Sequence, residues 1–268
     1  MVKTSKKQMR KVGLIGCGAI GTVLADAIER KIVVCDELIV YDFDSSRAEQ
    51  LKKMLKFPTT IVSGVDELIK LRPAVIVEAA SQKAAKDYVP KIVAADIELI
   101  VMSTGALLDL DVDMSKVHVP SGAIGGLDAI ASAALTGAIE VTLTSRKTPK
   151  AFDIETKVPK VMYEGDAEDA ARKFPREMNV AATLAITVKP SKVNVQVIAD
   201  PNVVRTTHEI TAKWKYGDMF LRFSNQPHPD NPKTSALAAW AAIRLLKTLL
   251  HKPSFYSNII IKKSISAL

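Results

Sequence analysis

The chain has 268 residues, 48% of them hydrophobic and 25% charged, a composition typical of a globular protein with a core of normal size. Its two cysteines, Cys17 and Cys35, are too few for a disulfide-stapled scaffold, so we expect the reducing cytoplasm. The formal net charge of +8 lies entirely in residues 1–11 and 252–268, because residues 12–251 balance 29 basic against 29 acidic residues. We therefore expect no nucleic-acid partner, and the lack of a long uncharged apolar run predicts no membrane partner.

Short β-branched runs alternate with helical stretches in the first part of the chain. Strands are predicted at 11–16, 37–42, 59–63, 74–80 and 98–104. Between them, apolar residues recur at helical spacing over 19–30, 45–56, 65–71 and 82–95. Strands separated by single helices cannot pair as hairpins. The pattern predicts an α/β fold with a doubly wound parallel sheet of Rossmann type, in a domain over residues 1–118.

The pattern changes after residue 118, where a second α+β domain is expected over residues 119–233. A loop leading into a small-residue helix is predicted at 120–137, and further helices at 167–174 and 179–188. Strands with antiparallel character are predicted at 139–147, 194–200, 205–214 and 218–225. A long helix is predicted over 231–252, with Pro232 and Thr234 or Ser235 at its start. We expect the segment 234–268 to return to the first domain.

A glycine motif, GCGAIG, follows the first predicted strand and opens the first predicted helix. Gly16 would allow the tight turn, Gly18 the approach of a pyrophosphate, and Gly21 close packing of helix on strand. Unpaired N–H groups at the helix start, around Ala19 and Ile20, would face the phosphates. This context predicts a dinucleotide cofactor, NAD or NADP, rather than a purely structural turn.

The choice between the two nucleotides stays open at this stage. Asp42 ends the second predicted strand, where its carboxylate would accept hydrogen bonds from the ribose 2′-OH of NAD. Ser45, Ser46 and Arg47 follow directly and would accommodate the 2′-phosphate of NADP. Arg47 can equally be a solvated helix residue, so use of both nucleotides is compatible with the pattern.

Two further segments lie at the carboxyl ends of predicted strands, where a cofactor of this fold is reached. EAAS at 78–81 includes Ala80 and Ser81, and STGAL covers 103–107. Small residues there let a nicotinamide ribose lie against the backbone, although small residues also mark tight helix packing. Ala80 and Ser81 are therefore candidate cofactor contacts.

His208 is the histidine that is the strongest candidate for chemistry. It lies within ADPNVVRTTHEITAKW, close in sequence to Arg205, Thr206, Thr207 and Glu209. Imidazole is suited to proton transfer at neutral pH, although a strand histidine is more often structural. The polar neighbourhood favours a catalytic role. Because the cysteines and histidines lack ligand spacing, we predict that the site holds no metal.

Six segments together resemble the L-aspartate dehydrogenase family, and they occur in that family's order along nearly the whole chain. They are KVGLIGCGAIG at 11–21, VEAAS at 77–81, PSGAIGGLDAI at 120–130, FPREMNVAATLA at 174–185, ADPNVVRTTHEI at 199–210 and NPKTS at 231–235. The resemblance implies that Ala123 and Asn179 contact NAD(P) and that His208 is the active-site residue. It also implies a homodimer, and an activity that in many organisms feeds pyridine-nucleotide biosynthesis.

The chemistry that this resemblance implies is oxidation of L-aspartate to iminoaspartate, which is hydrolysed to oxaloacetate and ammonia. His208 would act as general base toward the ammonium group or the hydrolytic water. The two carboxylates of aspartate need cationic and hydroxyl donors. The candidates for substrate binding are Arg205, Asn231, Lys233, Thr234 and Ser235.

Two other interpretations stay open. A related oxidoreductase, similar to homoserine dehydrogenase or dihydrodipicolinate reductase, would use the same cofactor on a hydroxyl or ring substrate. A non-catalytic dinucleotide-binding regulator would bind NAD(P), but no amino-acid substrate would reduce the bound cofactor. The regulator is less favoured, since a sensor has no need of the His208 neighbourhood.

Overall fold

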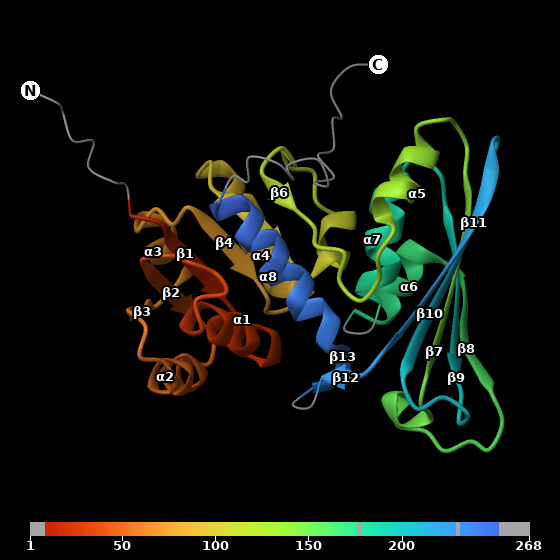
Figure 1. Ribbon diagram of the computed structural model, residues 1–268, viewed down its shortest axis with the longest axis horizontal. Coiled ribbons are helices and arrows are strands. Elements are labelled where there is room, and N and C mark those ends of the chain that lie inside the picture. Colours follow the sequence, from red (N-terminus) through yellow and green to blue (C-terminus); the bar gives the residue numbers. More distant parts are fainter. Residues whose placement is uncertain (1–8, 176–177, 229–230, 252–268) are drawn as a thin grey trace, which may run out of the picture.

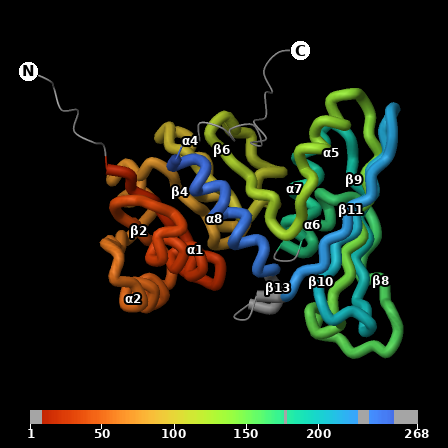
Figure 2. Tube along the Cα trace, viewed as in Figure 1, coloured from red at the N-terminus to blue at the C-terminus, as the bar shows by residue number. Residues whose placement is uncertain are grey.

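The protein folds around two β-sheets, seen in a computed structural model that describes residues 9–175, 178–228 and 231–251 (Figure 1). For residues 227, 228 and 231–234 it describes the backbone alone. One sheet and its helices form the N-terminal half of the molecule, and the second sheet lies at the opposite end (Figures 1 and 2). Among the described residues, no helix is long and apolar enough to span a bilayer.

The first sheet is entirely parallel, and its strand order is β3-β2-β1-β4-β5-β6. This order confirms the predicted Rossmann-type sheet. Its strands are β1 (Lys11–Ile15), β2 (Glu37–Tyr41), β3 (Thr59–Ile61), β4 (Val75–Glu78), β5 (Glu98–Val101) and β6 (Val117–His118). The helices between them are α1 (Ala19–Glu29), α2 (Ser45–Met54), α3 (Val65–Lys70) and α4 (Gln82–Ala94), with a 3₁₀ turn η1 (Thr104–Leu108) after β5.

Helices cover both faces of this sheet, which explains why its strands are apolar runs without polar alternation. In β4, Val75 and Val77 pack in a cluster with Leu24 of α1, whereas Ile76 packs in a second cluster with Ile92 of α4. All of these side chains are buried. The buried sheet thus holds the carboxyl ends of β1, β4 and β5 at one edge.

The second sheet has the order β11-β10-β7-β9-β8 and is mixed. Strands β7 and β9 are parallel and the other pairs are antiparallel, which agrees with the predicted α+β region. The strands are β7 (Glu140–Lys147), β8 (Lys160–Asp166), β9 (Val193–Ala199), β10 (Thr206–Trp214) and β11 (Gly217–Asn225). Helices α5 (Leu127–Ala134), α6 (Ala167–Lys173) and α7 (Asn179–Val188) cover the face toward the first domain, and a 3₁₀ turn η2 (Pro149–Phe152) follows β7 (Figure 1).

The C-terminal part of the described chain corrects one predicted boundary. Residues 231–234, predicted as the start of the last helix, instead belong to β13 (Asn231–Ser235), which pairs with β12 (Pro227–His228). The predicted cap residue Ser235 is confirmed as the N-cap of that helix. Helix α8 begins only at Ala236 and ends at Leu250, and the Ser235 side chain accepts a hydrogen bond from the Leu237 N–H. Residues 231–234 carry a helix-cap pattern and yet adopt a strand conformation. Serine and threonine side chains that can cap a helix also form hydrogen bonds with the backbone outside helices, so they are compatible with the end of a strand.

Helix α8 returns to the first sheet and packs against α1 (Figure 1). Ile243 and Leu246 of α8 are buried in the same cluster as Leu24 and Ile28 of α1. The chain thus crosses between the two halves twice, once before α5 and once before α8. The domain boundaries 1–118, 119–233 and 234–268 stay a prediction.

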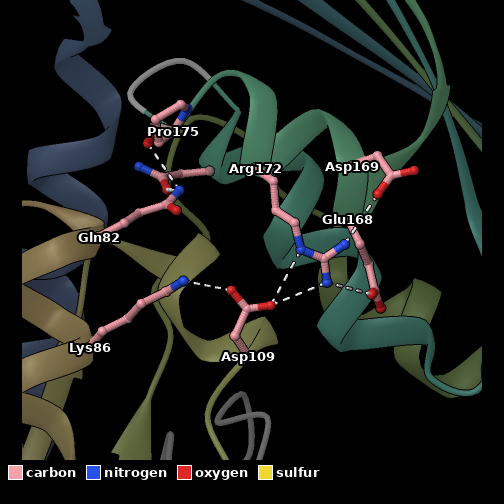
Figure 3. A network of polar contacts seen from close by, with 8 residues as sticks. Gln82, Lys86, Asp109, Glu168, Asp169, Arg172 and Pro175 are labelled. Carbon is pink, nitrogen blue, oxygen red and sulfur yellow. Dashed lines mark hydrogen bonds and ion pairs between the residues drawn. The ribbon is translucent and has the colours of Figure 1, made fainter.

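A polar network also connects the two halves (Figure 3). Asp109 accepts from Lys86 of α4 at 2.6 Å and from Arg172 of α6 at 3.1 Å, and the hydrogen bond from Lys86 is the main cause that lowers the pKa of Asp109. Arg172 also contacts Glu168 and Asp169 on its own helix. Exposed ion pairs of this kind contribute about 0–1 kcal/mol each, so the network orients α6 more than it stabilises the fold.

Candidate active site

The loop between β1 and α1 lies at the carboxyl edge of the parallel sheet and carries the glycine motif. Gly16 has φ +98°, and a Cβ there would lie 2.6 Å from the Ala79 carbonyl oxygen. At Gly21 a Cβ would overlap the carbonyl oxygen of Gly16. At Gly18, by contrast, a Cβ would have no described atom within 4 Å. Gly16 and Gly21 are therefore needed for packing, whereas Gly18 leaves open space beside the loop.

Helix α1 starts at this open space. Gly18 is its N-cap residue, and within the described chain no side chain caps it and no acidic residue lies in its first turn. The first turn, around Ala19 and Ile20, therefore presents its N–H groups without an acidic residue of its own. A helix start of this kind favours an anion, because the unpaired N–H groups and the helix dipole act together.

Asp42 is fixed beside the glycine loop. Its Oδ2 accepts from the Cys17 N–H at 2.7 Å, and its Oδ1 accepts from the Asp44 N–H at 2.9 Å. The carboxylate faces a cavity of about 530 Å³ whose lining includes Gly16, Gly18, Asp42, Arg47, Ala80 and Ser81. Most of the sequence-predicted cofactor contacts of the first domain thus surround one cavity.

The ion pair between Arg47 and Asp44 is relevant to the choice between NAD and NADP, because Arg47 is the candidate contact for the 2′-phosphate. The Arg47 Nε lies 3.5 Å from a carboxylate oxygen of Asp44, and both side chains are more than half exposed. Asp44 also caps α2 by accepting from the Ser46 N–H. Arg47 is therefore held at the edge of the cavity by a weak, solvated ion pair.

A second cavity, of about 100 Å³, lies between the two halves of the molecule. The glycine motif contributes to both cavities, since Gly18 lines the first and Ile20, on α1, lines the second. Five sequence-predicted residues line the second cavity: Ile20, Ala123, Asn179, His208 and Ser235. It is also lined by Thr104 and Thr206, which belong to segments that the sequence analysis considered. The lining further includes Met102, Ser121, Lys147 and Thr183, which were not selected as site residues.

Glu78 holds together the two strand-end segments that reach these cavities. Its side chain is fully buried and accepts from the Ala80 N–H at 2.9 Å, from the Ser103 N–H at 3.0 Å and from the Ser103 hydroxyl at 2.9 Å. Burial raises the pKa of this carboxyl group, and the hydrogen bonds oppose that rise. Glu78 thus connects the segment EAAS (78–81) to the segment STGAL (103–107). Thr104, which follows Ser103 in the second segment, lines the second cavity.

Asn179, the first residue of α7, connects the second half to the first at this cavity. Its backbone oxygen accepts from the hydroxyls of Thr104 at 3.1 Å and Thr183 at 2.9 Å. Its side-chain oxygen lies 3.5 Å from both the Gly105 nitrogen and the Gln82 amide nitrogen. Asn179 is therefore positioned by hydrogen bonds from both halves.

The loop that contains Ala123 is fixed to the second sheet. The Asn225 side-chain amide of β11 donates to the Ala123 carbonyl oxygen at 2.7 Å. Gly126 has φ +72°, and a Cβ there would lie 2.7 Å from the Leu221 side chain of the same strand. The loop is thus packed closely over β11 and forms one wall of the cavity.

His208 lies on β10 with 3% of its surface exposed, and it lines the second cavity. Its Nδ1 lies 2.9 Å from the Ser145 hydroxyl, on the neighbouring strand β7. Burial, and next the charge of Lys147, lower the pKa of His208 from 6.5 to about 3. The imidazole is therefore neutral at physiological pH.

The strand geometry separates His208 from part of its predicted neighbourhood. Side chains alternate between the two faces of a strand, so Thr206 lies on the same face as His208 while Glu209 lies on the other. Glu209 contacts Arg222 of β11 at 3.2 Å. Arg205 is exposed and does not line the cavity. The sequence analysis grouped Arg205 and Glu209 with His208 because they are close in sequence, but the structure does not place their side chains beside His208 in the cavity.

Lys147 is the most important residue that the sequence analysis missed. It ends β7 on the same face as Ser145, and 4% of its surface is exposed. Arg146 lies on the opposite face and contacts Asp200 at 3.2 Å. The signal was present in the alternation of 139–147, because a lysine on the apolar face of a strand is rarely buried without a function or a partner.

The segment NPKTS is only partly described. The backbone of Asn231, Lys233 and Thr234 belongs to β13, and their side chains lie outside the described part of the structure. Ser235 is described and lines the second cavity. Across the described residues, no cluster of three or more His, Cys, Asp or Glu side chains could hold a metal ion.

Comparison with known proteins identifies the family. Residues 128–249 match the family described as "Aspartate dehydrogenase, C-terminal", and residues 16–116 match "Homoserine dehydrogenase, NAD binding domain". The L-aspartate dehydrogenase of Archaeoglobus fulgidus is 42% identical over 248 residues, which cover 89% of this chain and 97% of that protein. The chain belongs to the L-aspartate dehydrogenase family. The L-aspartate dehydrogenase of Methanococcoides burtonii is 38% identical over 264 residues, covering 90% of this chain and 97% of that protein.

The solved structures agree with this family assignment. Aspartate dehydrogenase from Thermotoga maritima aligns with a TM-score of 0.71 and 26% identity, covering 92% of this chain and 99% of that chain. The resemblance of the six motif segments to the L-aspartate dehydrogenase family is therefore confirmed. The two-part fold, a Rossmann-type sheet and a second mixed domain, is confirmed as well.

Proposed function

We propose that the chain oxidises L-aspartate with NAD or NADP to iminoaspartate, which water converts to oxaloacetate and ammonia. The observation that supports this most directly is the position of His208, a buried neutral imidazole lining the cavity next to the dinucleotide loop. The relatives named L-aspartate dehydrogenase, aligned over about 90% of the chain, support the choice of substrate.

The residues around the first cavity fit a dinucleotide. The open space above Gly18 and the start of α1 would hold the pyrophosphate, and Asp42 would accept the ribose hydroxyls. Gly16, Ala19, Ile20, Gly21, Ala80 and Ser81 would lie against the cofactor backbone, with Ala123 and Asn179 at the nicotinamide end. When bound, the cofactor supplies a hydride acceptor at the nicotinamide ring.

His208 is proposed to move the proton. Loss of a hydride from the α-carbon of aspartate and of a proton from its amine gives the imine, and a water must then add to release ammonia. A neutral imidazole accepts a proton from the amine or from that water, and Ser145 orients the ring through Nδ1. The Ser235 hydroxyl at the cavity is proposed as a substrate contact, together with Asn231, Lys233 and Thr234 of the same segment.

A direct assay tests this proposal. The purified full-length chain is mixed with L-aspartate and either NAD or NADP, and formation of the reduced nucleotide is followed by absorbance. Parallel reactions with L-homoserine and without substrate test the related oxidoreductase and the regulator. Reduction that depends on L-aspartate is expected. Reduction with L-homoserine instead, or cofactor binding without any reduction, would overturn the proposal.

We also propose that the chain forms a homodimer through the second sheet. Helices α5–α7 cover one face of this sheet, and no described element covers the other face (Figures 1 and 2). Phe220 is 61% exposed on that outer face, in register with Thr211 and Thr142 on the neighbouring strands. Light scattering on the full chain should give a dimer mass, and Phe220→Asp should shift it toward the monomer; a monomeric wild-type chain would contradict this.

The proposed location is the cytoplasm. Both cysteines are free and buried. Burial is the main cause that raises the pKa of Cys17 to about 12 and that of Cys35 to about 11. Thiols that stay protonated do not react readily to form disulfides. Two buried thiols of this kind fit a reducing compartment.

A further inference from the structure

Two segments, 78–82 and 103–105, are joined to each other at the carboxyl edge of the parallel sheet. The carboxylate of Glu78, the last residue of β4, accepts hydrogen bonds from the N–H and the hydroxyl of Ser103 at 3.0 and 2.9 Å. At the other end of the segments, Gln82 lies directly against Gly105, because a Cβ at Gly105 would be only 2.0 Å from the Gln82 amide nitrogen. The two segments are therefore connected at both of their ends.

Glu78 is a polar residue in an apolar row of the sheet. Its register partners on the two neighbouring strands, Ile15 of β1 and Val101 of β5, are both buried and apolar. An apolar residue at position 78 would fit this row, whereas a buried carboxyl group is costly unless hydrogen bonds satisfy it. Here both carboxylate oxygens accept from a backbone N–H, Oε1 from Ala80 and Oε2 from Ser103. The carboxylate thus serves the connection of the two segments rather than the packing of the core.

This connection lies at the point of the sheet where a dinucleotide crosses it. The strand order reverses between β1 and β4, and ligands of such sheets bind at the carboxyl ends of the strands around that point. Pairing with Ile15 of β1 places Glu78 there. Ala80 and Ser81 line the first cavity, and Thr104 lines the second. One carboxylate therefore fixes segments that border both cavities.

The segment 103–105 also holds Asn179 of the second half. The Thr104 hydroxyl donates to the Asn179 backbone oxygen at 3.1 Å, and the Asn179 side-chain oxygen lies 3.5 Å from the Gly105 nitrogen. The Gln82 amide lies 3.5 Å from the same side-chain oxygen and donates to the Pro175 carbonyl at 3.0 Å (Figure 3). A shift of the segment would therefore displace Asn179, which is proposed to lie at the nicotinamide end of the cofactor.

We infer that Glu78 is a positioning residue, whose buried carboxylate holds the site of the nicotinamide half of the dinucleotide through Ser103, Thr104 and Asn179. The inference deepens the proposed function and rests on it for the identity of the cofactor. A change at Glu78 should disturb the nicotinamide half and spare the adenosine half, for which Gly18 and Asp42 are proposed. A role in stability alone would disturb both halves equally.

The variants Glu78→Gln and Ser103→Ala test this inference. Glutamine keeps the size of the side chain and one acceptor oxygen, but its amide nitrogen cannot accept from an N–H. Ser103→Ala removes only the hydroxyl, so it tests the same connection even where Glu78→Gln prevents folding. Glu37→Gln is the matched control, because Glu37 is a carboxylate at the opposite, amino end of β2, where it accepts from the Thr60 hydroxyl at 2.7 Å.

The measurement compares two nucleotides that differ in the nicotinamide alone. The first is NADH or NADPH, whichever the wild-type chain binds more tightly, and the second is the matching ADP-ribose or its 2′-phosphate. Calorimetry well below the melting temperature of each variant gives both affinities, and the fluorescence of the reduced ring reports its surroundings.

Glu78→Gln should weaken binding of the reduced nucleotide by about 10-fold or more, the range of a lost hydrogen bond to a charged group. It should also lose most of the fluorescence change that the wild-type chain gives. Affinity for the ADP-ribose nucleotide should stay within about twofold of the wild-type value, less than the loss of one hydrogen bond. Ser103→Ala should show the same pattern to a smaller degree, and Glu37→Gln should match the wild-type chain.

An equal loss of affinity for both nucleotides in Glu78→Gln and Ser103→Ala would overturn the inference, and so would wild-type affinities in both variants. A wild-type chain that binds the two nucleotides equally would overturn it as well, since its site then does not hold the nicotinamide half. Failure of the proposed function gives a different result, in which no reduction of NAD or NADP depends on L-aspartate. Because the binding measurements contain no L-aspartate, they still decide the role of Glu78 in that case.

Discussion

The hydroxyl of Ser145 lies 2.9 Å from Nδ1 of His208, across the paired strands β7 and β10. Both side chains are buried, so solvent does not compete for this contact. With Nδ1 engaged by the serine, Nε2 is the ring nitrogen that remains for a proton of the substrate or of water. The serine thus positions the ring that the proposed chemistry needs.

Replacement of His208 by asparagine should separate chemistry from cofactor binding. General acid–base residues contribute about 10²–10⁴-fold to rate, so turnover of L-aspartate should fall by roughly that factor in His208→Asn. NAD(P) affinity should be nearly unchanged, since the cavity around Gly18 and Asp42 does not include this residue. Steady-state rates and calorimetric cofactor binding on one preparation check both expectations.

The control for this variant is His251→Asn, at the end of α8, where the ring contacts Arg10 at 2.9 Å. It removes a histidine far from the cavity and should keep wild-type turnover. A stable, cofactor-binding His208→Asn variant that retains more than about a third of wild-type turnover would refute the catalytic role, because that loss is too small for a positioned proton-transfer group.

The lowered pKa of His208 also predicts how stability depends on pH. Burial, and next Lys147, hold this pKa at about 3 in the folded protein, compared with 6.5 for the exposed side chain. Between these two values the unfolded chain binds a proton that the folded chain does not. The free energy of unfolding should therefore fall as the pH drops through this window, by up to about 1.4 kcal/mol per pH unit from this group.

Urea unfolding at several pH values between about 7 and 4 measures this dependence. Carboxyl groups also titrate in that range, so the informative quantity is the difference between the wild-type chain and His208→Asn, which lacks the titrating ring. The wild-type chain should lose stability more steeply toward low pH. Parallel curves for the two proteins would show that His208 is not held neutral by the fold.

The central strands of the first sheet, β1, β2, β4 and β5, were predictable because they are buried on both faces, whereas the two-residue strand β6 was not predicted. Val75, Ile76 and Val77 form a continuous apolar run, and the helices between such runs follow from their spacing. Strand β8 was not predicted. Its residues, Lys160–Asp166, are mostly exposed or half-buried at the edge of the second sheet, so they lack both an apolar run and an alternating pattern.

The candidate site was predictable where a local motif carries the chemistry, and not where the tertiary fold creates it. Gly18 and Asp42 belong to a strand, turn and helix that are contiguous or nearly so in sequence. The contacts of Lys147 with the cavity, and of Glu78 with Ser103, arise only when separate strands are paired. Arg205 was grouped with His208 by proximity, although it precedes β10 and is exposed.

Asp42 should decide the nucleotide preference. If its carboxylate accepts the ribose hydroxyls, Asp42→Ala should raise the Michaelis constant for NAD by roughly 10- to 100-fold, the range of a hydrogen bond to a charged group. The constant for NADP should change much less, because the variant also removes repulsion of the 2′-phosphate. Asp36→Ala, an exposed carboxylate that accepts from the Arg10 N–H, is the control. Equal effects of Asp42→Ala on both nucleotides would make Asp42 a strand-end residue without a role in nucleotide choice.

The two glycines Gly18 and Gly21 should respond to substitution in opposite ways. Gly18 has φ −79°, and a Cβ there meets open space, so Gly18→Val should keep the wild-type melting temperature. The added side chain would occupy the space of the pyrophosphate and weaken NAD binding by at least about tenfold. A Cβ at Gly21 would overlap the Gly16 carbonyl oxygen, so Gly21→Ala should destabilise the fold by about 1–3 kcal/mol.

Thermal melting and calorimetric NAD binding of both variants give a crossed comparison. Gly18→Val should lose affinity without losing stability, whereas Gly21→Ala should lose stability first, since its effect on NAD comes through displacement of the loop. Unchanged NAD affinity in a folded Gly18→Val variant would place the cofactor elsewhere. Equal loss of stability in the two variants would instead show that Gly18 is needed for packing, which contradicts the open space observed above it.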